Sequence, residues 1–295
     1  MNKDGLLKYN IDVQPVAMVL VTVGLSLLPF FVAMPVWFLV PYFVLVIFAK
    51  SFIPFAQHNH AHLAIFNSKA LNHVFDVFLT QCTGYPTALW ELHHTRGHHR
   101  NFLTPELDVA RIIDLKTGQV MSRWRYALNG NMTIHRDSIQ IGKEEGRQGR
   151  KPLLAKLYGE IAVQTAITLA LLAWHPWLAL TFFVIPNTFN SFMIWWESYP
   201  HHLGVPTTSL YDASVTIESR SYNLQTLNLG HHTAHHEKPT LHWSLLPART
   251  EAIRSRIPEM CVHEEYSRSS KVQLAETRRK SEQRLPREKA APYTL

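Results

Sequence analysis

Cysteine is nearly absent from this chain, which has only Cys82 and Cys261 among 295 residues. Two cysteines this far apart cannot form a disulfide framework or a cysteine-based zinc site, and they fit a reducing compartment. The sequence also has no Cys-x-x-Cys pair for an iron–sulfur or rubredoxin unit, and no stretch that fits a haem-binding module. We therefore expect any electrons that this protein uses to come from a separate carrier.

Charged side chains are missing from two long stretches, residues 13–49 and 161–196. Each stretch would span roughly 55 Å as one straight helix, whereas the hydrocarbon core of a membrane is about 30 Å thick. Pro35 and the His175-Pro176 pair lie near the midpoints, where a turn would break the helix. The sequence therefore predicts an all-α integral membrane protein with four transmembrane helices in two hairpins, at about residues 13–32, 36–56, 157–174 and 177–199.

Lysine and arginine are absent from the turns expected within the two hairpins. Since positive charge accumulates on the cytoplasmic side, both termini and the long middle segment are predicted to face the cytoplasm. The net charge of +7 then favours contact with anionic membrane lipid, and no motif indicates nucleic-acid binding. We expect a membrane domain over residues 1–262 with an uncleaved first span, a solvated loop at residues 142–150, and a charged cytoplasmic tail over residues 263–295.

Histidine is abundant, with 18 residues that fall mostly into four short clusters, each within reach of one end of an apolar stretch. A second span that starts near residue 36 reaches His58 after about 33 Å, and a fourth span that starts near Trp177 reaches His202 after about 37 Å. Both distances are close to one membrane thickness. The clusters are therefore predicted to meet at one membrane surface, in a cytoplasmic helical cap.

The number of histidines indicates the kind of site. Imidazole suits iron, copper, zinc or nickel, and nine or more imidazoles exceed the first shell of one ion, which holds about four to six ligands. A structural zinc site would need only about four ligands and would normally include cysteine. The sequence thus predicts a histidine-rich site for two metal ions.

The clusters resemble the three histidine boxes of the integral-membrane di-iron desaturases and hydroxylases. His58 and His62 match a His-x3-His box, and His94, His98 and His99 match a His-x3-His-His box. The third box, His-x2-His-His, is matched by the segment Asn228-Leu-Gly-His-His-Thr-Ala-His-His-Glu-Lys-Pro239. The resemblance covers roughly residues 36–247 and implies the metal ligands His58, His62, His94, His98, His99, His202, His232, His235 and His236.

Some positions depart from the family pattern or stay open. The tyrosine expected in the third box is His231, and an asparagine that some desaturases place one turn before the lone histidine is replaced by Ser198 or Glu197. His201 is the reserve for His202. Imidazole ligands usually pass their other N–H to a carboxylate or carbonyl group. The candidates for additional ligands or for such supporting groups are His60, His93, His201, His231, Glu197 and Asp108, with Glu91, Glu106, Asp212 and Glu237 also close enough in sequence.

The resemblance implies an enzyme that holds two iron ions, cycling between Fe2+ and Fe3+, and uses O2 as co-substrate. Its third box is similar to that of the bacterial desaturases, which places the protein in a bacterial inner membrane. The expected partners are a fatty acyl substrate, either free or bound to lipid, CoA or carrier protein, and a separate electron donor such as a ferredoxin-like protein. The basic groups predicted to dock that donor are Arg96, Arg100, Arg111 and Arg278–Lys280.

Desaturation is the outcome that the third box favours, but box two is similar to that of membrane alkane hydroxylases. Hydroxylation is therefore an alternative outcome at the same site. Decarboxylation to a terminal olefin is another, because the bacterial branch that box three resembles also includes a terminal-olefin-forming decarboxylase. A divalent-metal transporter is disfavoured, because the spans are nearly free of ionisable residues. Aromatic residues near the boxes are candidates for lining a substrate tunnel or capping it, namely Phe75, Phe78, Tyr85, Trp90 and Trp196.

Overall fold

The structure, a computed structural model, describes residues 2, 4–150 and 152–266. Over this part the chain is mostly helical, and the strands form only two short ladders. Four helical runs are long and apolar enough to cross a membrane, namely Asn10–Phe31, Val36–His62, Pro152–Trp174 and Pro176–His202. The predicted all-α fold with four membrane helices is confirmed.

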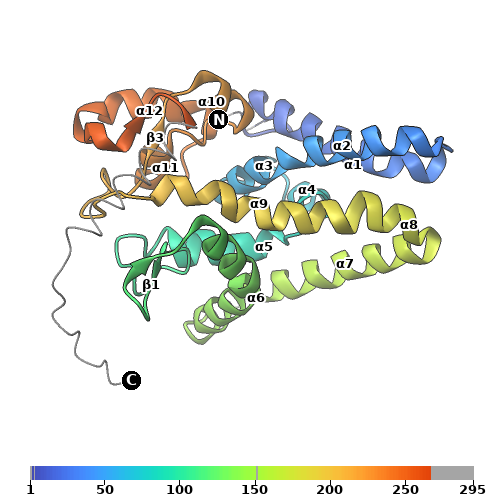
Figure 1. The fold of residues 1–295 in the computed structure, drawn as a ribbon, viewed down its shortest axis with the longest axis horizontal. Helices are drawn as coiled ribbons and strands as arrows, with labels where there is room; N and C mark the ends of the chain where they lie inside the picture. The colour runs from blue at the N-terminus through green and yellow to red at the C-terminus, as the bar shows by residue number, and fades with distance from the viewer. Residues whose placement is uncertain (1, 3, 151, 267–295) are drawn as a thin grey trace.

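The long helices extend in one direction from the rest of the molecule (Figure 1). The first hairpin consists of α1 (Val13–Phe31), which follows a short turn η1 (Asn10–Asp12), and α2 (Val36–Ser51), which continues into α3 (Ile53–His62). The second hairpin consists of α7 (Pro152–Trp174) and a return run of three segments, α8 (Pro176–Ala179), the π-helix η3 (Leu180–Val184) and α9 (Ile185–His202). Both returning runs end in histidines.

The outward faces of these helices carry large apolar side chains. Val36 is 81% exposed, Trp37 77% and Trp177 74%, and all three lie near the turns of the hairpins. Such a surface is unfavourable in water but suits lipid. The inner faces pack into a core around Tyr42, Val46 and Phe182.

The connecting segment between the hairpins lies against the histidine-bearing ends of the long helices. Ser68 caps α4 at its start, and Gly84 ends this helix in a left-handed conformation with a φ of 83° that favours glycine. The elements of this segment are α4 (Lys69–Thr83), α5 (Thr87–Trp90), the π-helix η2 (Glu91–His98), β1 (Ile113–Asp114), β2 (Gln119–Val120) and α6 (Arg123–Arg147). Strands β1 and β2 pair antiparallel, Ile113 with Val120.

The solvated loop predicted at residues 142–150 is wrong for most of its length, because α6 extends to Arg147. Gly142 lets α6 approach α7 closely: a Cβ at this position would lie 2.9 Å from Leu154. Glu145 is buried and pairs with Arg100 and Arg150. The carboxylate of Glu145 therefore lies against neighbouring elements, whereas the side chains of Arg100 and Arg150 are 50% exposed.

The segment after α9 forms a small lobe over the histidine-bearing ends of the long helices. Its elements are β3 (Thr216–Ile217), α10 (Arg220–Gln225), α11 (His232–Glu237), η4 (Trp243–Leu245), α12 (Leu246–Ile253), η5 (Arg254–Arg256), η6 (Glu259–Cys261) and β4 (Val262–His263). Strand β4 pairs parallel with β3, and Tyr266 stacks on Tyr222. Residues 263–266, the first of the charged tail predicted over residues 263–295, lie in this lobe, and residues 267–295 lie outside the described part.

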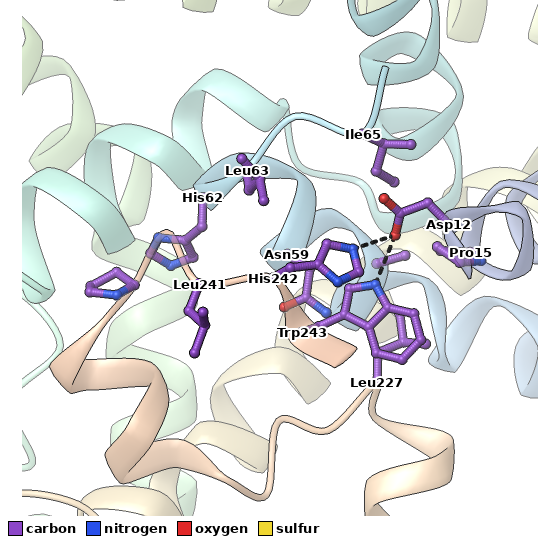
Figure 2. Close-up of a pocket in the computed structure, with 12 residues that line it drawn as sticks. Asp12, Pro15, Asn59, His62, Leu63, Ile65, Leu227, Leu241, His242 and Trp243 are labelled. Carbon is purple, nitrogen blue, oxygen red and sulfur yellow. Dashed lines mark hydrogen bonds and ion pairs between the residues drawn. The ribbon is translucent and has the colours of Figure 1, made fainter. Parts of the chain in front are cut away.

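Asp12 ties this lobe to the first membrane helix. Its buried carboxylate accepts hydrogen bonds from the Nε2–H of His242 at 2.9 Å and from the Nε1–H of Trp243 at 2.8 Å (Figure 2). Tyr9 stacks on the His242 ring. The small pocket drawn in Figure 2 is also lined by His62, so this link lies beside the histidine cluster.

Candidate metal centre

The nine predicted ligand histidines converge in one region, although they come from four separate elements and the loop that follows η2. Two groups have ligand nitrogens within 4.8 Å of one another: one holds His58, His62, His94, His99 and His235, and the other holds His98, His202 and His236. The ninth, His232, has its Nε2 atom 3.2 Å from that of His202 and 3.1 Å from that of His236. Two neighbouring sites are thus outlined.

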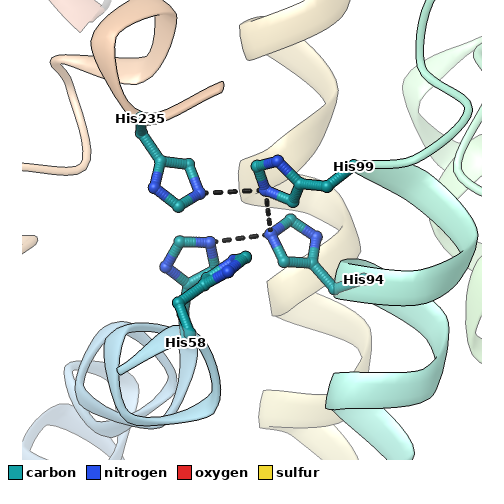
Figure 3. A group of neighbouring side chains, drawn as sticks. His58, His94, His99 and His235 are labelled. Atoms are coloured by element: carbon teal, nitrogen blue, oxygen red, sulfur yellow. Dashed lines mark hydrogen bonds between the residues drawn. The ribbon is translucent and has the colours of Figure 1, made fainter. Parts of the chain in front are cut away.

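The first group contains a chain of close nitrogen contacts (Figure 3). The Nε2 atom of His94 lies 2.8 Å from that of His58 and 3.0 Å from that of His99. His99 in turn has its Nε2 atom 3.0 Å from that of His235. The rings point toward one common space. Each of the three contacts joins two Nε2 atoms, and a single proton cannot provide a hydrogen bond for all three.

The π-helix η2 explains how one short segment contributes to both groups. The N–H of His99 donates to the carbonyl of His94, five residues earlier, at 2.8 Å. This wider turn aligns residues five apart, whereas an α-helix aligns residues three or four apart. His94 and His99 therefore join the first group while His98 joins the second.

Hydrogen bonds on the far side of two rings turn their Nε2 atoms toward the centre. The Nδ1–H of His98 donates to both carboxylate oxygens of Asp108, at 2.9 and 3.0 Å, and the Nδ1–H of His202 donates to the carbonyl of Ala213 at 3.0 Å. Asp108 is buried, which raises its pKa, but the interaction with His98 outweighs this and lowers the pKa below its usual value. An ionised Asp108 fixes the orientation of His98.

Burial keeps the cluster in the form that binds metal. It lowers the pKa of His94, His99, His235 and His236 well below the usual range for histidine, and neighbouring imidazoles lower it further. Neutral imidazoles offer lone pairs to a cation.

Metal coordination accounts for the spacing of these nitrogens. Ligand nitrogens about 2.1 Å from one ion lie about 3 Å apart when the bond angles are near 90°, which agrees with the nitrogen contacts of 2.8–3.2 Å between these rings. Both ring nitrogens of His62 are buried without a hydrogen-bond partner, which a native protein tolerates at such a site. The residues fit two metal ions.

The four additional histidines lie outside the two groups. His60 contacts Asp76 and accepts a hydrogen bond from the N–H of Ile65, and His231 contacts the Thr250 hydroxyl. The ring of His93 lies edge-on to Trp195. His201 lies closest to the cluster: its ring centroid is 4.4 Å from that of His232, but its Nε2 atom bonds the Tyr222 hydroxyl at 2.9 Å.

Among the acidic candidates, Asp108 forms its hydrogen bonds with a ligand histidine. Four others contact residues that are not ligands. Glu197 lies near Arg123, Glu91 near Arg96, and Glu237 pairs with Arg249. Asp212 accepts hydrogen bonds from Thr208 and Ser209.

A cavity of about 410 Å³ lies against the histidine cluster. His58, His94, His98, His202 and His232 line it, so ions held by these residues would border its space. Its apolar wall comes from α2, α3, the residue between them and α9, and includes Phe48, Phe52, Pro54, Phe55, Phe189, Met193 and Ile194. Phe48 and Phe189 are also exposed, so this wall reaches the outer surface of the membrane helices.

Of the predicted tunnel residues, Trp90 lines this cavity. Phe75 and Tyr85 lie in packed cores and Phe78 and Trp196 pack against those cores, so these four do not line this cavity. Sequence reasoning missed Tyr222, Gln225 and Tyr266, which line the cavity from the lobe after α9. No local signal marks them, because they approach α9 only through the chain fold.

Together these features define a helical membrane protein whose long helices deliver histidines to a metal site beside an apolar cavity. The chain belongs to the fatty acid desaturase family, since the family model described as fatty acid desaturase matches residues 35–267. The expected resemblance is thereby confirmed, and the protein is an oxidoreductase of the fatty acid desaturase and hydroxylase type. No match is found among the curated proteins.

Proposed function

We propose that this protein desaturates a fatty acyl chain, using O2 and electrons from a separate carrier protein. The single observation that carries the proposal is the cavity of about 410 Å³ that has both an apolar wall and five of the predicted ligand histidines. An acyl chain in this cavity would run past the histidine cluster. The cytoplasm would hold the cap and both termini, and the membrane would be the inner membrane of a bacterium.

Two iron ions are the proposed metals, and they would supply the activation of O2 that removal of hydrogen from an unactivated methylene group needs. His58, His62, His94, His99 and His235 would hold one ion, and His98, His202, His232 and His236 the other. Asp108 and the Ala213 carbonyl would hold His98 and His202 in their orientations. The apolar wall would position the substrate chain and exclude water from the reacting carbons.

Metal and product analysis test this proposal together. Protein purified with iron should contain two iron ions per chain, and His98→Ala should lose at least one of them together with oxygen consumption. Incubation with a fatty acyl substrate, O2 and a reducing system should give an alkene by mass spectrometry. An alcohol or a shortened terminal olefin would establish the alternative outcomes, and zinc alone without oxygen consumption would contradict the proposal.

A further inference from the structure

The cavity has a polar part as well as an apolar wall. Glu197 and Ser198 of α9, Tyr222 and Gln225 of α10, and Tyr266 line it. Glu197 is 30% exposed at its side chain and contributes a carboxylate to this lining. Among the described residues that line the cavity, Glu197 is the only acidic one and none is lysine or arginine.

Arg123 does not line the cavity but contacts Glu197 and Tyr266, which do. The Nε–H of Arg123 donates to the Trp196 carbonyl at 2.8 Å, and its Nη2 donates to the Tyr266 hydroxyl. Its guanidinium lies over the Trp196 ring, 4.4 Å from the centroid, and 5.8 Å from that of Tyr266. Arg123 is therefore bound by Trp196 and Tyr266. It also lies 3.7 Å from the Glu197 carboxylate and offsets the negative charge of that group.

We propose that the polar part of this cavity receives an uncharged head group that donates a hydrogen bond to Glu197, such as a hydroxyl or an amide group, and disfavours an anion. This inference rests on the proposed function, since it assumes that the cavity binds an acyl or alkyl chain. An ionised carboxylate, phosphate or sulfonate would meet the Glu197 carboxylate in a part of the cavity where no lysine or arginine lines the wall to compensate its charge. A hydroxyl or amide hydrogen satisfies the same carboxylate.

Glu197 also lies close to the reacting region along α9. It precedes His201 by four residues, which places both on one face of the helix, and it precedes His202 by five. A head group bound at Glu197 therefore holds the neighbouring chain carbons beside the histidine cluster. The carboxylate is a specificity-determining group that would contact the substrate and not the metal ions.

Competition binding with head groups on one chain length tests this inference without any turnover. Purified iron-loaded protein in detergent is incubated with tritiated hexadecanol, and binding is measured by scintillation proximity. Hexadecanamide should displace the label at a concentration at least about tenfold lower than hexadecanesulfonate, which is ionised at any working pH. In Glu197→Gln this difference should shrink to less than about threefold, because the repelling charge is gone.

Two variants serve as controls. Glu218→Gln removes a carboxylate that also pairs with an arginine, but one outside the cavity lining, and should keep the wild-type preference. Glu197→Asp keeps the negative charge and should also keep the wild-type preference for the amide. Equal or stronger competition by the sulfonate in the wild-type protein overturns the inference and leaves the proposed function intact. If no long-chain compound of any kind binds saturably, the proposed function fails as well.

Discussion

The Nε2 atoms of His94 and His99 lie 3.0 Å apart although the two residues are five positions apart in the chain. The π-helix makes this approach possible, and it leaves His98 free to face His202 and His236. A single turn of backbone therefore divides one histidine box between two neighbouring groups. π-helical turns are rare and occur often at functional sites.

The neighbours His231 and His232 give a matched pair for the ligand assignment. His232 contacts His202 and His236 through its Nε2 atom, whereas His231 contacts Thr250. His232→Ala should lose at least one of two bound iron ions, and His231→Ala should keep both. Metal content by mass spectrometry of the purified variants checks this. Equal metal content in the two variants would contradict the assignment of His232.

Asp108 should control metal affinity through His98. Asp108→Asn keeps the size of the side chain but weakens the hydrogen bond from the His98 ring, so metal affinity should fall by about 10–100-fold. Titration with a competing chelator measures the change. Glu106→Gln is the control, because Glu106 is exposed and only two residues away. The same loss in both variants would mean that the effect is not transmitted by His98.

Much of this site could be predicted from the sequence because the signals are local. The uncharged stretches indicated the spans, and the resemblance of the three boxes indicated the candidate ligand histidines. The division of His94, His98 and His99 between two groups could not be predicted, because the spacing alone does not reveal a π-helix. The helix over residues 142–147 was missed for a related reason: its glycines and charges are typical of a loop, and their partners, Leu154 and Arg100, are distant in sequence.

Gly130 should be needed for the contact between α6 and α9. A Cβ at this position would overlap the Trp195 ring, which lines the cavity, so Gly130→Ala should destabilise the protein by about 1–3 kcal/mol. Gly159 in α7 is the matched control, because nothing lies within 4 Å of the position of its Cβ. Gly159→Ala should stabilise by about 0.5–1 kcal/mol through its helix propensity. Thermal unfolding in detergent measures both changes in stability. A Gly130→Ala variant as stable as the wild type would show that α6 can shift.

Glu145 should make stability depend on pH. Hydrogen bonds from Arg150, together with Arg100, lower its pKa from 4.5 to about 2. Because the folded pKa is the lower one, the ionised group stabilises the fold above pH 4.5, and this contribution disappears as the pH falls toward 2. The melting temperatures of wild type and Glu145→Gln should therefore differ at pH 7 and converge on acidification. A difference that stays constant with pH would rule out the carboxylate as its source.

Asp12 should hold the lobe that carries the third histidine box against the first membrane helix. Asp12→Ala leaves the buried Nε1–H of Trp243 and the Nε2–H of His242 without their acceptor, and hydrogen bonds to a charged group contribute about 1.5–3 kcal/mol each. We expect a lower melting temperature and faster proteolysis between residues 238 and 260. Asp4→Ala, an exposed carboxylate in the same N-terminal segment, should change neither. The pocket beside this link also borders His62, so Asp12→Ala should further speed the release of metal to a chelator. Unchanged release together with a lowered melting temperature would show that the lobe can loosen without opening the histidine cluster.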